Sequence, residues 1–314
     1  MNSFDSTMKV IDQLEEFVKP DFAVVTIGTF DGVHIGHQAI LKKVVTDARN
    51  NHGQSVLITF WPHPRFILKK DPDQLRLLTT FEEKVDLVKE LGIDYIIKIP
   101  FTPAFSDLSA EDFVRDILVN KVGTKKLYIG YDHHFGNNRE GNIDFLKKVA
   151  PRYHFEVMEI ARQDIDDIGV SSTKIRKALL DGNIRLANSL LGRNFSLTGK
   201  VIHGNKKGRE LGYPTANLEI PESYKLLPGD GSYAVLAHYQ NQKFKAMLNV
   251  GFKPTVDGSK RTIETHLFNF DQQIYDEFLT IEFIQSLRKE MKFENIDQLK
   301  KQLEIDEVNA LNIL

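Results

Sequence analysis

Residues 24–37 read VVTIGTFDGVHIGH, a short apolar run followed by a glycine-rich turn. A helical pattern follows, in which Ile40, Leu41, Val44 and Ala48 recur at helical spacing. A strand, a tight polar turn and then a helix is the building unit of parallel α/β sheets. This stretch therefore predicts the fold class of the residues around it.

Further apolar runs continue the same alternation up to about residue 190. They are continuous instead of alternating, as expected for strands buried on both faces of a parallel sheet, and they cover Ser55–Phe60, Tyr95–Ile99, Lys126–Ile129 and Phe155–Ile160. Between them, Thr80 to Glu83 predicts a capping-box helix start, and Ser109 precedes a helix that should end at Gly123. We predict a doubly wound, Rossmann-like parallel-sheet domain over residues 1–190.

The pattern changes beyond about residue 195. Closely spaced strands separated by polar turns are predicted at Leu197–Ile202, Tyr233–Tyr239, Phe244–Val250, Thr262–Phe270 and Leu279–Ile284. This spacing predicts a small antiparallel β-barrel over residues 191–314, covered by a terminal helix from about Ile296. The segment Gly182–Asn194 looks helical and should join the two domains, the number expected from 314 residues.

The composition is that of an ordinary globular protein, with 41% hydrophobic and 27% charged residues. The absence of cysteine excludes disulfides, iron–sulfur clusters, thiolate zinc sites and cysteine nucleophiles. A formal net charge of −2 argues against a nucleic-acid partner, and no signal peptide or membrane-length apolar run is visible. We expect a cytoplasmic enzyme of small metabolites with no membrane or nucleic-acid partner.

Polar and glycine-rich segments follow the predicted parallel strands at residues 28–37, 61–65, 130–139 and 169–176. Ligands of open parallel sheets bind beyond the carboxyl ends of the strands, so these segments should converge on one pocket.

His34 and His37 stand three residues apart at a predicted helix start, so both can face one side. The helix N–H groups and dipole favour anions there, and Gly36 would let a phosphate approach closely. Two core or capping histidines, or half of a zinc site, are the alternatives. The strand–glycine–helix context favours binding of a triphosphate.

The segment SSTKIR, residues 171–176, offers hydroxyls, cations and helix N–H groups together. Ser171, Ser172, Lys174 and Arg176 would suit nucleotide phosphates. The same residues could equally form an ordinary N-cap followed by solvated cations, and the pattern alone leaves both open.

The second domain carries a basic, glycine-rich loop, GNKKGRELGY at residues 204–213, which is not a Walker A motif. Thr215 and Asn217 follow, and they are either hard oxygen donors suited to Mg²⁺ or common turn formers. In the strand Thr262–Phe270, Glu264 shares a face with His266, which indicates a catalytic base or a buried polar network. Arg288 in the C-terminal loop region could hold a phosphate or a flavin carbonyl.

The first domain resembles the FAD synthetase half of the prokaryotic bifunctional riboflavin kinase/FMN adenylyltransferase family. The resemblance rests on TIGTFDGVHIGH at 26–37, PHP at 62–64 and SSTKIR at 171–176. It implies that the His34–His37 pair is the nucleotidyltransferase H-x-G-H motif and that Arg176 holds the departing phosphates. The implied ATP- and flavin-binding residues are Gly28, Phe30, Gly36, His63, Asp132, Ser171, Ser172 and Lys174. Trp61 could stack on the flavin or serve packing.

The second domain resembles the riboflavin kinase half of the same family, through GRELGYPTAN at 208–217, NVGFKPT at 249–255 and ETHLF at 264–268. The resemblance implies a six-stranded barrel, with Thr215 and Asn217 on Mg²⁺–ATP and Glu264 as base toward the ribityl terminal hydroxyl. Gly208, Arg209 and Arg288 would bind ATP or flavin.

Together these resemblances imply phosphorylation of riboflavin to FMN and adenylylation of FMN to FAD, with ATP as co-substrate and pyrophosphate as product. One alternative is an adenylyl- or cytidylyltransferase of another phosphate substrate with a regulatory barrel, against which Asn217 and Glu264 argue. Another is a binding protein with inactive sites, against which the histidine pair argues. The sequence leaves the oligomeric state open.

Overall fold

The computed structural model describes residues 8–68, 75–130, 133–160, 169–204, 207–255 and 258–314. Contacts within the chain divide it into two compact units, residues 1–171 and 172–314. By this division, helices α8 (Ser172–Leu180) and α9 (Ile184–Leu191) belong with the second unit. The functional division at residue 190 stays a prediction.

The first unit is built on a six-stranded, fully parallel sheet in the order β1-β4-β3-β2-β5-β6. The strands are β1 (Lys9–Ile11), β2 (Ala23–Ile27), β3 (Gln54–Trp61), β4 (Tyr95–Pro100), β5 (Thr124–Gly130) and β6 (Glu156–Ile160). This confirms the predicted parallel sheet. The three-residue edge strand β1 was not predicted, because it is too short to show a pattern.

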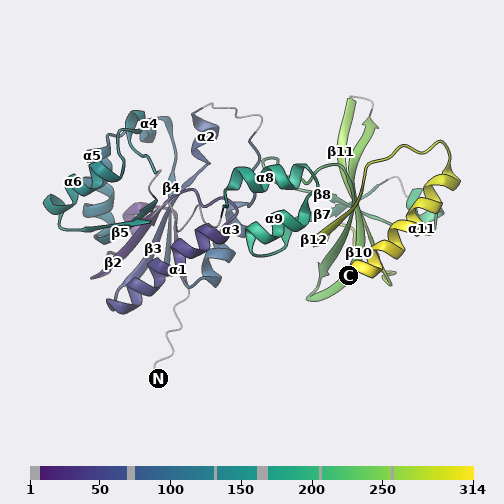
Figure 1. Cartoon of the computed structure of the whole chain (residues 1–314), viewed down its shortest axis with the longest axis horizontal. Helices are drawn as coiled ribbons and strands as arrows, with labels where there is room; N and C mark the ends of the chain where they lie inside the picture. The colour runs from purple at the N-terminus through teal and green to yellow at the C-terminus, as the bar shows by residue number, and fades with distance from the viewer. Residues whose placement is uncertain (1–7, 69–74, 131–132, 161–168, 205–206, 256–257) are drawn as a thin grey trace, which may run out of the picture. The chain divides into compact units, whose positions relative to one another are not determined.

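Both faces of the sheet are covered by helices (Figure 1). The helices of this unit are α1 (Ile35–Asn50), α2 (Pro64–Ile67), α3 (Phe81–Glu90), α4 (Pro103–Ser106), α5 (Ala110–Asp112), the π-helix η2 (Phe113–Val122) and α6 (Ile143–Tyr153), with short 3₁₀ turns η1 (Leu14–Glu16) and η3 (Asn137–Arg139). Successive strand residues point to opposite faces: Val24 packs with α1 and α3, whereas Val25 packs with η2 and α6. This is why the strands are continuously apolar.

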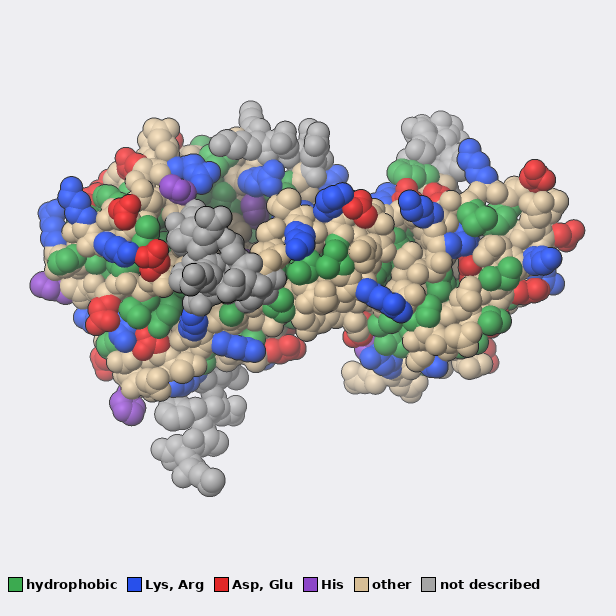
Figure 2. Space-filling view, in the orientation of Figure 1, with side chains coloured by type: hydrophobic (Ala, Val, Ile, Leu, Met, Phe, Trp, Pro, Cys, Tyr) green, Lys and Arg blue, Asp and Glu red, His purple; other side chains and the backbone are tan. Residues whose placement is uncertain are grey.

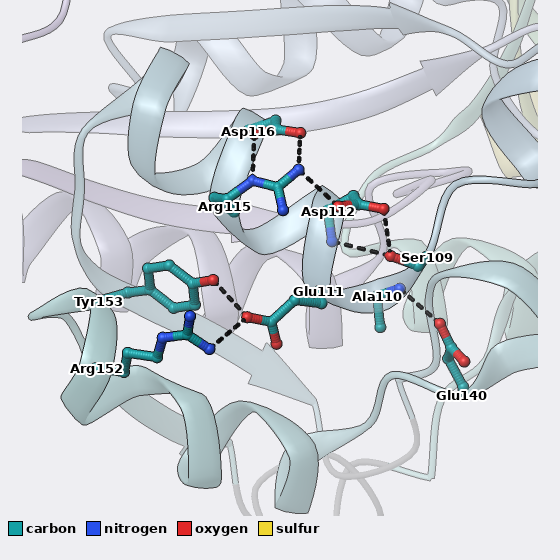
Figure 3. Close-up of polar contacts among 9 residues, drawn as sticks. All are labelled: Ser109, Ala110, Glu111, Asp112, Arg115, Asp116, Glu140, Arg152 and Tyr153. Carbon is teal, nitrogen blue, oxygen red and sulfur yellow. Dashed lines mark hydrogen bonds and ion pairs between the residues drawn. The ribbon is translucent and has the colours of Figure 1, made fainter.

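The helix predicted after Ser109 begins and ends where expected, although most of it is π-helical. The Ser109 hydroxyl accepts from the Asp112 N–H at 3.0 Å, and Ala110 N–H donates to Glu140 at 2.8 Å (Figure 3). Glu111 accepts from Tyr153 at the end of α6. At the other end, Gly123 adopts φ +72, the left-handed conformation that ends helices.

The second unit is a closed six-stranded barrel in the order β10-β11-β8-β7-β12-β9, which confirms the predicted architecture. Its elements are β7 (Phe195–Ile202), α10 (Lys207–Glu210), β8 (Ala216–Glu219), β9 (Gly231–Tyr239), β10 (Gln242–Thr255), β11 (Gly258–Leu267), β12 (Phe278–Lys289) and α11 (Ile296–Ile313). The terminal helix α11 starts at the predicted residue. The strand predicted to run to Phe270 ends at Leu267.

Acidic and basic side chains are interspersed over the face shown in Figure 2, in keeping with the small net charge. The helices are also not of the membrane-spanning kind: among the residues that the structure describes, no helix is long and apolar enough to cross a membrane.

Candidate active sites

The loop after β2 turns sharply into α1. Phe30, Gly32 and Val33 all have positive φ values, of +46, +83 and +37. His34 is the N-cap of α1, where its Nδ1 accepts from the His37 N–H at 3.3 Å. The histidine pair thus shapes the helix N-terminus, the place where backbone donors favour an anion.

The two imidazole rings stack on one another, as the spacing predicts. Their centroids lie 3.5 Å apart with 15° between the planes, and the ring of Phe30 packs on His37 at 4.8 Å. His34 is only 5% exposed. The cap uses Nδ1 of His34, so capping by itself does not argue against ligand binding by this pair.

The segment that precedes Ser171 lies against the first turn of α1. A Cβ added at Gly36 would lie 3.0 Å from Val170 Cγ1 and 3.4 Å from the His34 ring. The missing side chain at Gly36 therefore makes room for Val170 and His34, a use that the sequence did not indicate.

The remaining predicted groups of the first domain are placed as follows. His63 is the N-cap of α2, with Nδ1 accepting from the Arg65 N–H at 3.2 Å, and Trp61 packs on Phe81 at 5.8 Å. Trp61 thus has a packing partner within its own unit. Asp132 lies outside the described residues.

The phosphate-binding candidates SSTKIR continue directly from Val170. Ser171 ends the first unit, and Ser172 is the first residue of α8 in the second. Ser171 and Lys174 are exposed, whereas Ser172 and Arg176 are partly buried.

The barrel site is a row of polar residues that strand register places side by side. Asn217 of β8 pairs with Glu264 of β11, Glu264 pairs with Asn249 of β10, and Asn249 pairs with Ser232 of β9. Ser232 in turn pairs with Arg288 of β12. All five line one cavity of about 450 Å³. Five strands therefore contribute one side chain each to the same wall.

Hydrogen bonds connect this row to its surroundings. Thr215 Oγ1 donates to Glu264 Oε2 at 3.4 Å, and Ser232 Oγ donates to Asn249 Oδ1 at 3.3 Å. His266 donates from Nδ1 to the Pro214 carbonyl at 2.7 Å, which fixes its ring beside Thr215. His266 and Glu264 share a face, as predicted.

Arg288 lies near the end of β12, so its predicted place in a loop is wrong. Its Nε donates to both carboxylate oxygens of Asp306 in α11, at 3.1 and 3.0 Å, and Asp306 is 2% exposed. This ion pair fastens the terminal helix to the rim of the cavity.

A second cavity, of about 390 Å³, adjoins the first at Thr215, which lines both cavities. Arg209, Phe270 and Tyr275 line the second cavity, whereas Gly208 lines the first. The basic loop at residues 204–213 and Thr215 therefore contribute to both cavities, so a molecule bound in each would lie next to the other.

Three residues of the barrel site escaped sequence reasoning: Ser232, Asn249 and Asp306. Ser232 and Asn249 lie in strands whose pairing no local pattern specifies, and Asp306 looks like one more charge on an amphipathic helix. The short β8 was also missed because the residues around Asn217 look like a turn.

Comparisons with known proteins agree with both halves of this description. Residues 18–174 match the FAD synthetase family model, and residues 191–314 match the riboflavin kinase model. The chain is 42% identical to the bifunctional riboflavin kinase/FMN adenylyltransferase of Buchnera aphidicola subsp. Schizaphis graminum. The aligned region covers 90% of this chain and 91% of that one. The same-named Escherichia coli (strain K12) protein is 35% identical, covering 91% of each.

A solved structure entitled macrolide-efflux protein from Streptococcus pneumoniae has a TM-score of 0.86 and 32% identity to this chain. It covers 97% of this chain, and this chain covers 99% of it. The architecture described above therefore occurs in a solved structure over nearly its whole length. The two family matches and the identities over nine-tenths of the chain show that this protein belongs to the bifunctional riboflavin kinase/FMN adenylyltransferase family.

Proposed function

We propose that the two reactions of this riboflavin kinase and FMN adenylyltransferase use the groups described above, the kinase in residues 191–314 and the adenylyltransferase in residues 1–190. The observation that carries the kinase assignment is the register of Asn217, Glu264 and Asn249, which lines up three polar side chains on one cavity wall. Thr215 joins this wall to a second cavity.

Riboflavin is proposed to occupy the larger cavity, whose wall also carries the apolar residues Leu211, Met247 and Leu303. An isoalloxazine ring needs such a surface, and its ribityl chain needs the polar row. ATP would occupy the second cavity, which shares Thr215 with the first. Glu264 would take the proton of the ribityl terminal hydroxyl as that oxygen attacks the γ-phosphorus, and ADP would leave.

Mg²⁺ is the metal that such a reaction implies. Among the described residues, no group of three or more His, Asp or Glu side chains could hold a metal by itself. The Thr215 hydroxyl and the Asn217 carboxamide are hard oxygen donors beside Glu264, which suits an ion that arrives with ATP and keeps several waters. Bound there, Mg²⁺ would neutralise charge on the phosphates.

For the adenylyltransferase, we propose that an FMN phosphate oxygen attacks the α-phosphorus of ATP and that pyrophosphate leaves. His34 and His37 would donate to the triphosphate beside the N-terminus of α1, stabilising the charge that develops there. His34 would use Nε2, because its Nδ1 accepts from the helix. The other proposed contacts to ATP or flavin are Gly28, Phe30, Gly36, His63, Asp132, Ser171, Ser172, Lys174 and Arg176, with Gly208, Arg209 and Arg288 in the kinase half.

The test is a time course with the purified full chain, riboflavin and ATP, with flavins separated by chromatography. With Mg²⁺ present, FMN should form first and FAD afterwards. Chelation of Mg²⁺ with EDTA should stop the kinase reaction, and excess Mg²⁺ should restore it. FMN formation at an unchanged rate in EDTA would refute the metal assignment. The proposed location is the cytoplasm, where ATP for both reactions is made.

A further inference from the structure

Helix α3 carries a lysine that points into the protein. The Lys84 side chain is 4% exposed, its Nζ donates to Thr59 Oγ1 of β3 at 3.4 Å, and it lies 5.8 Å from the centroid of the Phe81 ring. Burial lowers the pKa of Lys84 to about 8, and the negative charge of Asp31 acts against that shift. A buried ammonium is stabilised by a compensating charge nearby, and Asp31 is an acidic group whose charge acts on Lys84.

Asp31 is itself 3% exposed and lies in the loop after β2. Its Oδ1 accepts from the N–H of Leu78 at 2.9 Å, from the N–H of Thr79 at 3.2 Å and from the Thr79 hydroxyl at 3.4 Å. The Thr79 hydroxyl also accepts from the Gly32 N–H at 3.2 Å. Residues 31–32 are therefore bound to the two residues that precede Thr80, the N-cap of α3.

The loop that is held in this way is a strained one. Phe30 and Val33 have φ values of +46 and +37, which non-glycine residues adopt only where the surrounding structure enforces them. Phe30 and Val33 also determine the position of the histidine pair, since the Phe30 ring packs on His37 and Val33 immediately precedes His34. Loss of the hydrogen bonds at Asp31 and Gly32 would release the loop.

We propose that Asp31, Lys84 and Thr79 are positioning residues of the adenylyltransferase reaction. The buried ammonium of Lys84 balances the negative charge of the buried Asp31 carboxylate, and the carboxylate and the Thr79 hydroxyl fasten the loop that holds His34 and His37. None of the three needs to touch ATP or FMN. This inference rests on the proposed role of the histidine pair. The two can be tested separately, because the variants D31N, K84M and D31N/K84M report a charge coupling between Asp31 and Lys84 that substitution of the histidines does not report.

The first test measures kcat and KM for FAD formation from supplied FMN and ATP with the full-chain variants D31N and K84M. Each should lower kcat by about 10²-fold, because small displacements of positioned groups have effects of that size, with KM for ATP changed less than kcat. Riboflavin kinase activity of the same preparations should stay at the wild-type value. The K98M variant is the matched control: Lys98 lies 4.8 Å from the same Phe81 ring but pairs with Asp12, and its kcat should stay within about twofold of wild type.

The double variant D31N/K84M separates charge coupling from independent damage. Asp31→Asn removes the very charge that Lys84→Met leaves uncompensated, so the double variant should be no slower than K84M alone. A double variant slowed by the product of the two single effects would overturn the coupling. Single variants with kcat within about twofold of wild type would overturn the proposal as a whole.

Thr79 supplies a test that does not disturb a buried charge. Thr79→Val keeps the shape of the side chain but removes the hydroxyl that bonds Asp31 and Gly32, so it should lower kcat for FAD formation at least about tenfold. Thr79→Ser restores the hydroxyl and should recover most of the rate. Equal rates for the two variants would contradict the proposal, even where D31N or K84M fails to fold.

Discussion

The two proposed active sites are built on opposite principles. In the first unit, the loop after β2 and the cap of α1 hold His34 and His37. In the barrel, the groups lie within strands, and pairing aligns Asn217, Glu264 and Asn249. A loop-borne site depends on how the backbone turns, whereas a strand-borne site depends on register. Substitutions should therefore damage one reaction and leave the other intact.

The largest expected effect is on the strand-borne site. Glu264→Gln keeps the shape of the side chain but removes the base, so riboflavin phosphorylation should fall by about 10²- to 10⁴-fold. Adenylylation of supplied FMN should stay within about twofold of wild type, because Glu264 lies in β11 of the barrel and has no part in the proposed adenylyltransferase site. The two rates are measured on the same preparation, and a comparable loss of both would break the comparison.

The second-largest effect is expected at the loop-borne site. His34→Ala should lower kcat for FAD formation by about 10²- to 10³-fold, the effect typical of one donor to developing charge. Riboflavin phosphorylation should continue, so FMN should accumulate in the chromatogram. His154→Ala is the matched control, since that histidine ends α6 as its C-cap and takes no part in the proposed site. FAD formation by H34A at the rate of H154A would contradict the assignment.

The third prediction concerns the stability of the barrel, where the Arg288–Asp306 ion pair joins β12 to α11. Asp306→Ala leaves the Arg288 guanidinium, which is 16% exposed, without its carboxylate, so the free energy of unfolding should fall by about 3 kcal/mol. Urea denaturation measures this. Glu304→Ala, an exposed neighbour on the same helix, should change it by less than about 0.5 kcal/mol. Equal losses for both variants would mean that the pair does not fasten α11.

The smallest effect concerns the amino ends of β3 and β4, whereas the histidine pair follows the carboxyl end of β2. Asp94 is 6% exposed and accepts from Nη1 and Nη2 of Arg49, each at 2.8 Å, and from the Ser55 N–H at 2.8 Å. Burial alone would raise the pKa of Asp94, but the Arg49 and Ser55 hydrogen bonds outweigh it and hold the pKa below the usual value.

Because the pKa of Asp94 is lower in the folded protein, this group stabilises the fold above the unfolded pKa of about 4, and the stabilisation disappears as pH falls through the folded pKa. Asp94→Asn should lower the free energy of unfolding at pH 7 by about 1 kcal/mol, since Arg49 is half-exposed, and by less at pH 3. Urea denaturation at both pH values tests this, with the exposed Asp86→Asn as control. A larger difference at pH 3 than at pH 7 would contradict it.

The first unit and the barrel also differ in how much of their structure the sequence predicts. The run into α1 carries its own strand, turn and cap signals, so the fold of the first unit and the facing of His34 and His37 were predictable. The barrel and its terminal helix were predictable as elements. The row that joins Glu264 to Asn249 and Ser232 was not, because pairing between distant strands leaves no local signal.

Two further features lay beyond sequence reasoning for the same physical reason. Lys84 looks like an ordinary helix lysine, and only the packing of α3 against β3 shows that it is buried. Arg288 looked like a loop residue because β12 runs on to Lys289 through irregular pairing with β9. Long-range contacts decide both.

The most direct test of two independent sites mixes two variant proteins. E264Q and the double variant H34A/H37A are each supplied with riboflavin, ATP and Mg²⁺, alone and as an equimolar mixture, and FMN and FAD are quantified. We predict no flavin product from E264Q, FMN alone from H34A/H37A, and FAD from the mixture, because FMN made by one protein is adenylylated by the other. Folded variants that each lose both reactions, with no FAD from the mixture, would contradict the account.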